Sequence, residues 1–274
     1  MRRIALQLAL VGILLFTIIG CSFGGREQAP SPQASLPSTK VEHKLTVAAA
    51  SDLSLAFKEI GQAFEKKTNS KIEFTFSSTG TLAQQIENGA PFDIFAAADI
   101  SFVNDLKAKG KIIADTQQLY AQGRIGLATT MKSTLQVKEL KDFLDPQIKK
   151  IAIANPDHAP YGLAAKQALQ KAGLWDQLQD KLVFGKNISE TLTFITTGNA
   201  EAGIIAQSIV KEDETRFRLI DTSLYEPLNQ SIAVIKDTRE EELARQFVAY
   251  VNEPESRKIM QKYGFAPPPE SKNE

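Results

Sequence analysis

Residues 45–64 read LTVAAASDLSLAFKEIGQAF, and they contain a short apolar run followed by a helical pattern. The run from Leu45 to Ala50 is typical of a strand that is buried in a sheet. Ser51 and Asp52 come next, and either residue can cap the start of a helix. The apolar residues that follow recur with helical spacing, at Leu53, Ala56, Phe57, Ile60 and Phe64. The segment therefore predicts a strand that leads directly into a helix.

The alternation of strand and helix patterns continues along the chain. Further strands are predicted at 72–76, 93–98, 124–129, 151–154, 182–184, 202–206, 217–220 and 231–235. Helices are predicted at 82–89, 100–109, 163–172, 189–197, 239–252 and 255–263. This alternation indicates an α/β protein with largely parallel sheets. The 274 residues are enough for one large domain or for two smaller ones.

Composition excludes several classes of function. Lys plus Arg equals Asp plus Glu at 32 each, so the chain has no basic excess with which to hold nucleic acid. Cys21 is the single cysteine, which excludes an intramolecular disulfide and a multi-cysteine metal site. His43 and His158 stand far apart in the sequence, so there is no paired-histidine metal motif. We expect neither a cofactor nor a nucleic-acid partner.

The N-terminus has the pattern of an export signal. Met1-Arg2-Arg3 is followed by a largely apolar run from Ile4 to Ile19, and then by Gly20 and Cys21. Residues 1–20 are therefore predicted to be a signal peptide, with an uncleaved membrane anchor as the alternative. The ending resembles a bacterial lipobox, which implies cleavage before Cys21 and a lipid on its thiol. Residues 21–43 would then be the lipidated cysteine and a flexible tether rich in proline and serine.

Polar loops occur at four junctions where a predicted strand leads into a helix. They are Ser51-Asp52, residues 77–81, residues 159–162 and residues 187–189. In open α/β sheets such loops gather at the carboxyl ends of the strands, where ligands bind. Helix N-termini attract anions, and hydroxyl groups can donate further hydrogen bonds. One such loop usually only caps its helix, but four together favour an anion site. The chain has no phosphate-loop or dinucleotide-binding glycine motif, so nucleotide binding is not supported.

Catalytic alternatives have weaker support. There is no Gly-x-Ser-x-Gly elbow, and a nucleophilic Ser51 would have to use His158 as its base. Asp52, Asp93 and Asp99 can be considered as acid/base groups, but their positions favour caps and turns. We therefore do not expect an enzyme. A lipoprotein that only scaffolds other envelope proteins would have no reason to carry hydroxyls at several strand-to-helix turns.

Longer segments resemble the molybdate-binding proteins that serve ABC transporters. They are LTVAAASDL at 45–53, FSSTGTLAQQIENGAPFDIFAAAD at 76–99, IAIANPDHAPYGLAAKQAL at 151–169 and YGFAPP at 263–268. The resemblance implies a two-lobed periplasmic-binding-protein fold of type II, with two mixed sheets flanked by helices and a ligand cleft between the lobes. Lobe I would comprise residues 44–124 and 231–266, and lobe II residues 125–230.

The same resemblance implies a set of groups that bind the oxyanion. The hydroxyls fall on Ser51 and Thr79, and the backbone amides on Asp52, Tyr161 and Ile188. A tyrosine that donates in some relatives is replaced by Ala206, and the Tyr161 hydroxyl is a candidate substitute. The metal of molybdate or tungstate would be held only through its oxygens, and the Asp52 carboxylate must point away from the anion.

The resemblance also implies partners. A membrane permease of an ABC importer would receive the anion, and the protein would be a monomer held at the membrane by its lipid. Sulfate or thiosulfate is the alternative ligand, and a hydrolase that uses Ser51 or Asp52 is a weaker alternative.

Overall fold

The computed structural model describes residues 43–269 and contains two five-stranded sheets. The first sheet has the order β2-β1-β3-β10-β4, and the second has the order β7-β6-β8-β5-β9. The strands of the first sheet are β1 (Lys44–Ala50), β2 (Lys71–Ser77), β3 (Ile94–Ala97), β4 (Gln118–Gly123) and β10 (Leu228–Val234). Those of the second are β5 (Ile125–Thr130), β6 (Ile151–Ala154), β7 (Leu182–Gly185), β8 (Ala202–Ala206) and β9 (Thr215–Leu219). The predicted signal peptide and the lipidation site at Cys21 lie outside the described residues.

Both sheets are mixed, as the family resemblance implies, whereas the pattern of strands and helices alone predicts largely parallel sheets. In the first sheet β1 pairs in parallel with β2 and β3, whereas β10 pairs antiparallel with β3 and β4. In the second sheet β6 pairs in parallel with β7 and β8, whereas β5 pairs antiparallel with β8 and β9. The chain therefore contains two parallel three-stranded groups, and each group is extended by antiparallel strands.

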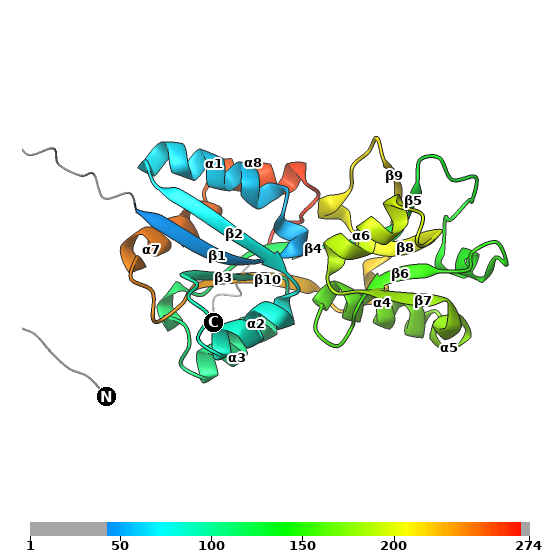
Figure 1. The fold of residues 1–274 in the computed structure, drawn as a ribbon, viewed down its shortest axis with the longest axis horizontal. Coiled ribbons are helices and arrows are strands. Elements are labelled where there is room, and N and C mark those ends of the chain that lie inside the picture. Colours follow the sequence, from blue (N-terminus) through cyan, green and yellow to red (C-terminus); the bar gives the residue numbers. More distant parts are fainter. Residues whose placement is uncertain (1–42, 270–274) are drawn as a thin grey trace, which may run out of the picture. The chain divides into compact units, whose positions relative to one another are not determined.

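Helices cover both faces of each sheet (Figure 1). On one face of the first sheet lie α1 (Ala56–Thr68), α7 (Glu241–Val251) and α8 (Pro254–Lys262), and on the other lie α2 (Thr79–Glu87) and α3 (Ile100–Ala108). The second sheet is flanked by α4 (Pro160–Lys171), α5 (Trp175–Leu178) and α6 (Ile188–Thr196). This architecture is the predicted α/β two-lobed fold.

Alternation along β1 shows how the first sheet is buried on both faces. Val47 and Ala49 belong to the core beneath α1 and α7, whereas Ala48 belongs to the core beneath α2 and α3. Successive strand residues point to opposite faces, so a strand covered on both sides must be apolar throughout. Leu45 and Val47–Ala50 meet this requirement, and the polar residue of the run, Thr46, donates its hydroxyl to the Pro91 carbonyl and to Asp93 Oδ2.

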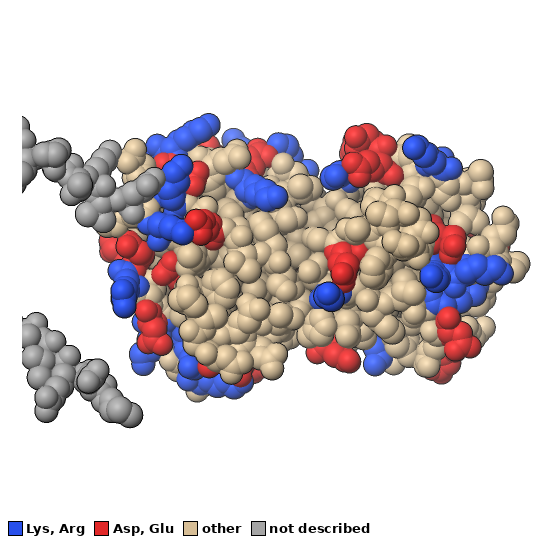
Figure 2. All heavy atoms as spheres, viewed as in Figure 1, with Lys and Arg blue, Asp and Glu red and all other residues tan. Residues whose placement is uncertain are grey.

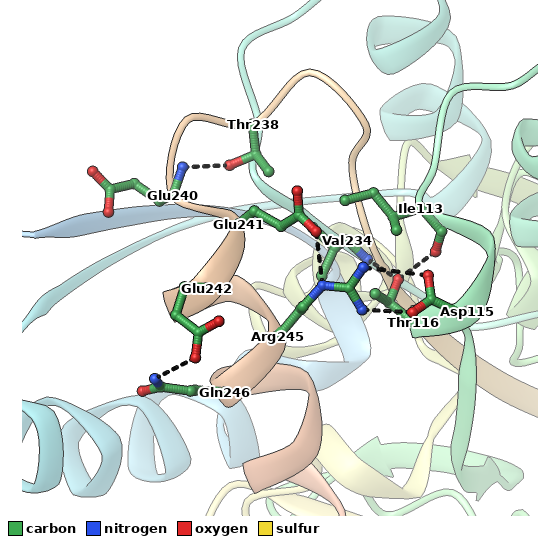
Figure 3. A network of polar contacts seen from close by, with 10 residues as sticks. All are labelled: Ile113, Asp115, Thr116, Val234, Thr238, Glu240, Glu241, Glu242, Arg245 and Gln246. Atoms are coloured by element: carbon green, nitrogen blue, oxygen red, sulfur yellow. Dashed lines mark hydrogen bonds and ion pairs between the residues drawn. The ribbon is translucent and has the colours of Figure 1, made fainter.

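A polar network attaches α7 to the rest of the first lobe (Figure 3). The Arg245 guanidinium contacts Asp115 at 2.7 Å and Glu241, one helical turn earlier, at 2.8 Å. Close by, the Thr116 hydroxyl accepts a hydrogen bond from the Val234 backbone amide at 2.9 Å. The ion pairs are exposed and contribute little to stability. The buried Thr116 bond satisfies a backbone group of β10 and fixes the turn before β4.

The chain passes between the two sheets at two places. Gly123 ends β4 and Ile125 begins β5, so Arg124 alone separates strands of different sheets. The return passes through residues 225–227 and enters the first sheet at Leu228, where β10 begins. The sequence places the return boundary at 231, within this strand. Both connections between the sheets are short.

Several local predictions differ from the structure. No helix is capped by Ser51 or Asp52, because a single 3₁₀ turn at Ser51–Leu53 intervenes before α1 begins at Ala56. Helix α4 begins at Pro160 rather than at residue 163; proline suits the first helical position, where its missing N–H would have had no acceptor. Strand β4 was not predicted. Among residues 43–269, no helix is long and apolar enough to cross a bilayer.

Candidate functional site

A small pocket lies where strands of both sheets end. It is lined by Ala50, Ser51, Asp52, Ser77, Ser78, Thr79, Ala98, Ala159, Pro160, Tyr161 and Ile188. Its empty space, including the part open to solvent, is about 190 Å³. The structure thus brings the five ligand positions predicted from the sequence to one small pocket.

Helix N-termini supply backbone donors to this pocket. Thr79, Pro160 and Ile188 are the first residues of α2, α4 and α6. The first four N–H groups of a helix have no partner within the helix, and they carry part of the positive end of its dipole. Tyr161 and Ile188 are therefore placed where their amides can donate to an anion.

The Thr79 hydroxyl is prepared as a hydrogen-bond donor. Its oxygen accepts a bond from the Ala98 amide at 3.1 Å, and the residue is only 1% exposed. The hydroxyl hydrogen remains to be donated. The neighbouring Ser78 hydroxyl differs, because it caps α2 through the Thr81 amide and also contacts Thr81 Oγ1 and His158 Nδ1. Thr79, unlike Ser78, thus keeps a hydroxyl hydrogen that it can donate to a ligand.

Ser51 is buried, and its hydroxyl forms no hydrogen bond with another residue in the range 43–269. Its carbonyl instead accepts a bond from the Ser189 hydroxyl at 3.1 Å. The hydroxyl can therefore donate to a ligand. His158, the base that a nucleophilic Ser51 would need, is bonded to Ser78. The geometry gives no support to a serine nucleophile.

Asp52 lines the pocket but directs its carboxylate to protein partners. Oδ2 accepts bonds from the Tyr161 hydroxyl at 3.0 Å and from Gln230 Nε2 at 2.6 Å. Oδ1 is buried without a hydrogen-bond partner among the described residues. Burial raises the pKa of the Asp52 carboxyl from its ordinary value of 3.8 to about 6, although the bonds from Gln230 and Tyr161 lower it. Burial also raises the pKa of Tyr161 far above 10, so its hydroxyl stays protonated.

This arrangement changes the expected role of Tyr161. The sequence offered its hydroxyl as a substitute for the donor lost at Ala206, but that hydroxyl is bonded to Asp52 and Gln230. Only the Tyr161 backbone amide is left for the anion. Gln230 and Tyr120, which complete the network, were not among the predicted site residues. Asn229 and Ser231 flank Gln230 in β10, so the sequence pattern does not single this glutamine out.

Several hydrogen bonds join the two lobes around the pocket. The Ser208 hydroxyl donates to the Asp52 carbonyl at 2.9 Å, and the Gly80 amide donates to the His158 carbonyl at 2.9 Å. Asp52 and Gly80 belong to the first lobe, before Arg124, whereas Ser208 and His158 belong to the second lobe, after it. The lobes thus meet directly over the residues that line the pocket.

The lining contains no lysine, arginine or histidine side chain. Within residues 43–269, no group of three or more His, Cys, Asp or Glu side chains is arranged to hold a metal ion. Basic and acidic residues are intermixed on the face shown in Figure 2. Any attraction of this pocket for an anion must therefore come from backbone amides, helix termini and hydroxyls.

Comparisons with known proteins agree in matching this chain to bacterial solute-binding proteins. The family model for bacterial extracellular solute-binding proteins matches residues 45–266. The molybdate-binding protein of Rhodobacter capsulatus is 32% identical over 84% of this chain and 90% of its own length. That of Azotobacter vinelandii is 34% identical, over 81% of this chain and 89% of its own length. The solved structure of an Azotobacter vinelandii periplasmic molybdate-binding protein superposes with a TM-score of 0.77 at 27% identity, and the match covers 82% of this chain and 99% of that one.

The pKa of Asp52 predicts a pH-dependent stability. In the unfolded chain the carboxyl ionises near 3.8, but in the folded protein it ionises near 6. Stability is therefore highest below pH 3.8 for this group and falls as the pH rises through 6, by roughly 3 kcal/mol in total. Asp52→Asn removes this titrating carboxyl. The free energy of unfolding in urea should therefore rise for the variant relative to the wild type between pH 4 and pH 7. Asp99→Asn, at the cap of α3, controls for the lost negative charge. If the difference in unfolding free energy between Asp52→Asn and the wild type stays constant with pH, the raised pKa of Asp52 is contradicted.

Proposed function

Because the chain belongs to the family of bacterial extracellular solute-binding proteins, we propose that it captures molybdate or tungstate and delivers it to the permease of an ABC importer. The observation that carries the proposal is the pocket itself. Two buried hydroxyl residues and the first turns of three helices surround a space for one small ion, with no cationic side chain in the lining.

Five groups form the proposed binding shell. Ser51 and Thr79 donate through their hydroxyls, and Asp52, Tyr161 and Ile188 donate through their backbone amides. Hydrogen bonds to an ionised acceptor are roughly twice as strong as neutral ones, so a dianion gains from several fixed donors without a formal positive charge. A shell without lysine or arginine also leaves no unpaired buried cation when the pocket is empty.

A shell made only of donors discriminates among oxyanions. Near neutral pH, phosphate carries a proton that needs an acceptor, and this shell supplies none. Sulfate carries no proton, so only size can exclude it. Metal–oxygen bonds in molybdate and tungstate are longer than sulfur–oxygen bonds, and a cavity set for the larger ions prevents sulfate from reaching every donor together. Molybdate and tungstate are nearly equal in size and should bind alike.

Closure of the lobes connects binding with transport. Ser51, Asp52 and Thr79 belong to the first lobe, whereas Tyr161 and Ile188 belong to the second. An anion that touches both lobes favours the closed arrangement by its additional contacts. The importer would then recognise the closed, loaded protein.

Calorimetric titration of the purified protein with four oxyanions tests the proposal. We expect molybdate and tungstate to bind with similar affinity, and sulfate and thiosulfate to bind at least a hundredfold more weakly. The expectation follows from the donor geometry, which a smaller ion cannot satisfy at all points. Tighter binding of sulfate or thiosulfate would make the protein a carrier of that anion and would refute the molybdate assignment.

Removing both hydroxyls tests the residue assignment. A hydrogen bond to a charged group contributes about 1.5–3 kcal/mol, so Ser51→Ala combined with Thr79→Ala should weaken molybdate binding at least tenfold. Ser101→Ala combined with Thr197→Ala removes the same chemical groups from exposed positions and serves as the control. If the two double variants bind molybdate equally well by calorimetry, the hydroxyls do not contact the anion.

We also propose that Cys21 anchors the protein to the outer face of the cytoplasmic membrane through a lipid. The prediction rests on the sequence around Cys21. The mature protein should begin at Cys21 and be heavier than its amino-acid mass, because acyl chains are attached. Intact mass spectrometry of the membrane-extracted protein measures both properties. The Cys21→Ser variant should show no acylated species in the mass spectrum. A wild-type protein that retains residues 1–20 would instead indicate an uncleaved anchor.

A further inference from the structure

Four buried side chains form one hydrogen-bonded network beneath the pocket. The Tyr161 hydroxyl donates to Asp52 Oδ2 at 3.0 Å, and Gln230 Nε2 donates to the same oxygen at 2.6 Å. Gln230 Nε2 also lies 3.0 Å from the Tyr161 oxygen. The Tyr120 hydroxyl lies 2.9 Å from Gln230 Oε1, which fixes the orientation of the amide. All four residues are at most 2% exposed, so water does not compete for these bonds.

The network joins elements that closure brings together. Asp52 lies in the turn after β1, and Tyr161 lies in the first turn of α4 in the second lobe. Tyr120 and Gln230 lie on β4 and β10, the strands of the first sheet next to the two connections between the lobes. The Tyr161–Asp52 bond therefore spans the lobes close to the points about which they can move.

Gly123 makes room for this contact. A Cβ atom added there would lie 2.2 Å from the Tyr161 hydroxyl oxygen and 3.0 Å from Gln230 Nε2. A separation of 2.2 Å is far inside normal contact, so any side chain at 123 would displace the tyrosine. The last residue of β4 must be glycine if Tyr161 is to reach Asp52 in this arrangement.

The Tyr161 hydroxyl has one hydrogen, and that hydrogen is donated to Asp52. It cannot serve the anion in the same arrangement. We propose that Tyr161 and Asp52 form an interlobe latch, positioned by Gln230 and Tyr120, that holds the closed protein together and slows release of the anion. The inference rests on the proposed function, because it assigns to these side chains the retention of the captured oxyanion. They are positioning residues, and they act on the ligand through the lobes.

The latch predicts a specific kinetic effect. Closure follows the first encounter with the anion, so loss of the latch should leave the association rate nearly unchanged and increase the dissociation rate. A buried hydrogen bond to a carboxylate corresponds to about tenfold or more in an equilibrium constant. We therefore expect Tyr161→Phe to release molybdate about tenfold faster than the wild type.

A chase experiment measures this effect. Protein loaded with isotopically labelled molybdate is mixed with excess unlabelled molybdate, and retained label is followed over time. Tyr225→Phe is the matched control, because Tyr225 is also a buried tyrosine next to a connection, but its hydroxyl meets the Ile125 amide at 3.4 Å and does not bridge the lobes. Tyr161→Phe should lose label about tenfold faster, whereas Tyr225→Phe should match the wild type.

Variants of Asp52 provide an independent test if Tyr161→Phe fails to fold. Asn keeps an oxygen that can accept from Tyr161, whereas Ala does not, so Asp52→Ala should release molybdate faster than Asp52→Asn. Equal release by these two variants, or unchanged release by Tyr161→Phe, would overturn the latch. A change in the ratio of molybdate to sulfate affinity in Tyr161→Phe would also overturn it, because the hydroxyl would then contact the anion. If the wild type binds no molybdate, the proposed function fails first and the inference fails with it.

Discussion

The carboxyl ends of two parallel strand groups meet at one pocket, and the rest of the site depends on this constraint. Strands β1, β2 and β3 run in parallel in the first sheet, as do β6, β7 and β8 in the second. A parallel strand must be followed by a crossover, which in this chain is most often a helix. The helices that begin there bring their first-turn N–H groups to the same edge, where other parts of the protein use some of them, such as those of Gly80 and Thr81. Donors for an anion are thus a consequence of the strand order before any side chain is chosen.

Side chains then decide which donors remain available. After β2, the Ser78 hydroxyl is used within the protein, whereas the Thr79 hydroxyl keeps a hydrogen to donate. The Tyr161 hydroxyl is withdrawn from the pocket by Asp52, although its backbone amide stays at the start of α4. Local hydrogen bonding therefore separates groups that look equivalent in the sequence into those that hold the protein together and those that can hold a ligand.

Much of the fold could be predicted because its signals are local. The buried strand 45–50, the helical spacing after it and the glycines that end several helices identify elements within a few residues. The position of Thr79 at a strand-to-helix junction was equally visible. Strand β4 was missed because its apolar run is only three residues long, Leu119–Ala121, between two glutamines, and its partner β10 lies more than a hundred residues away. Gln230 and Tyr120 were missed for the same reason: their role arises only when two distant strands and a turn come together.

The buried carboxyl of Asp52 gives the closed arrangement two opposing contributions. Removing it from water disfavours the ionised form, as its raised pKa of about 6 indicates, while the bonds from Tyr161 and Gln230 favour closure. If the bonds dominated strongly, an empty protein would close and could not admit an anion; if desolvation dominated, a loaded protein would open before reaching the importer. A ligand can shift an equilibrium only by its differential affinity for the two states. Under the proposed function, these two contributions must nearly cancel, so that a handful of hydrogen bonds to one small ion decides the conformation of a carrier that both captures and releases its ligand.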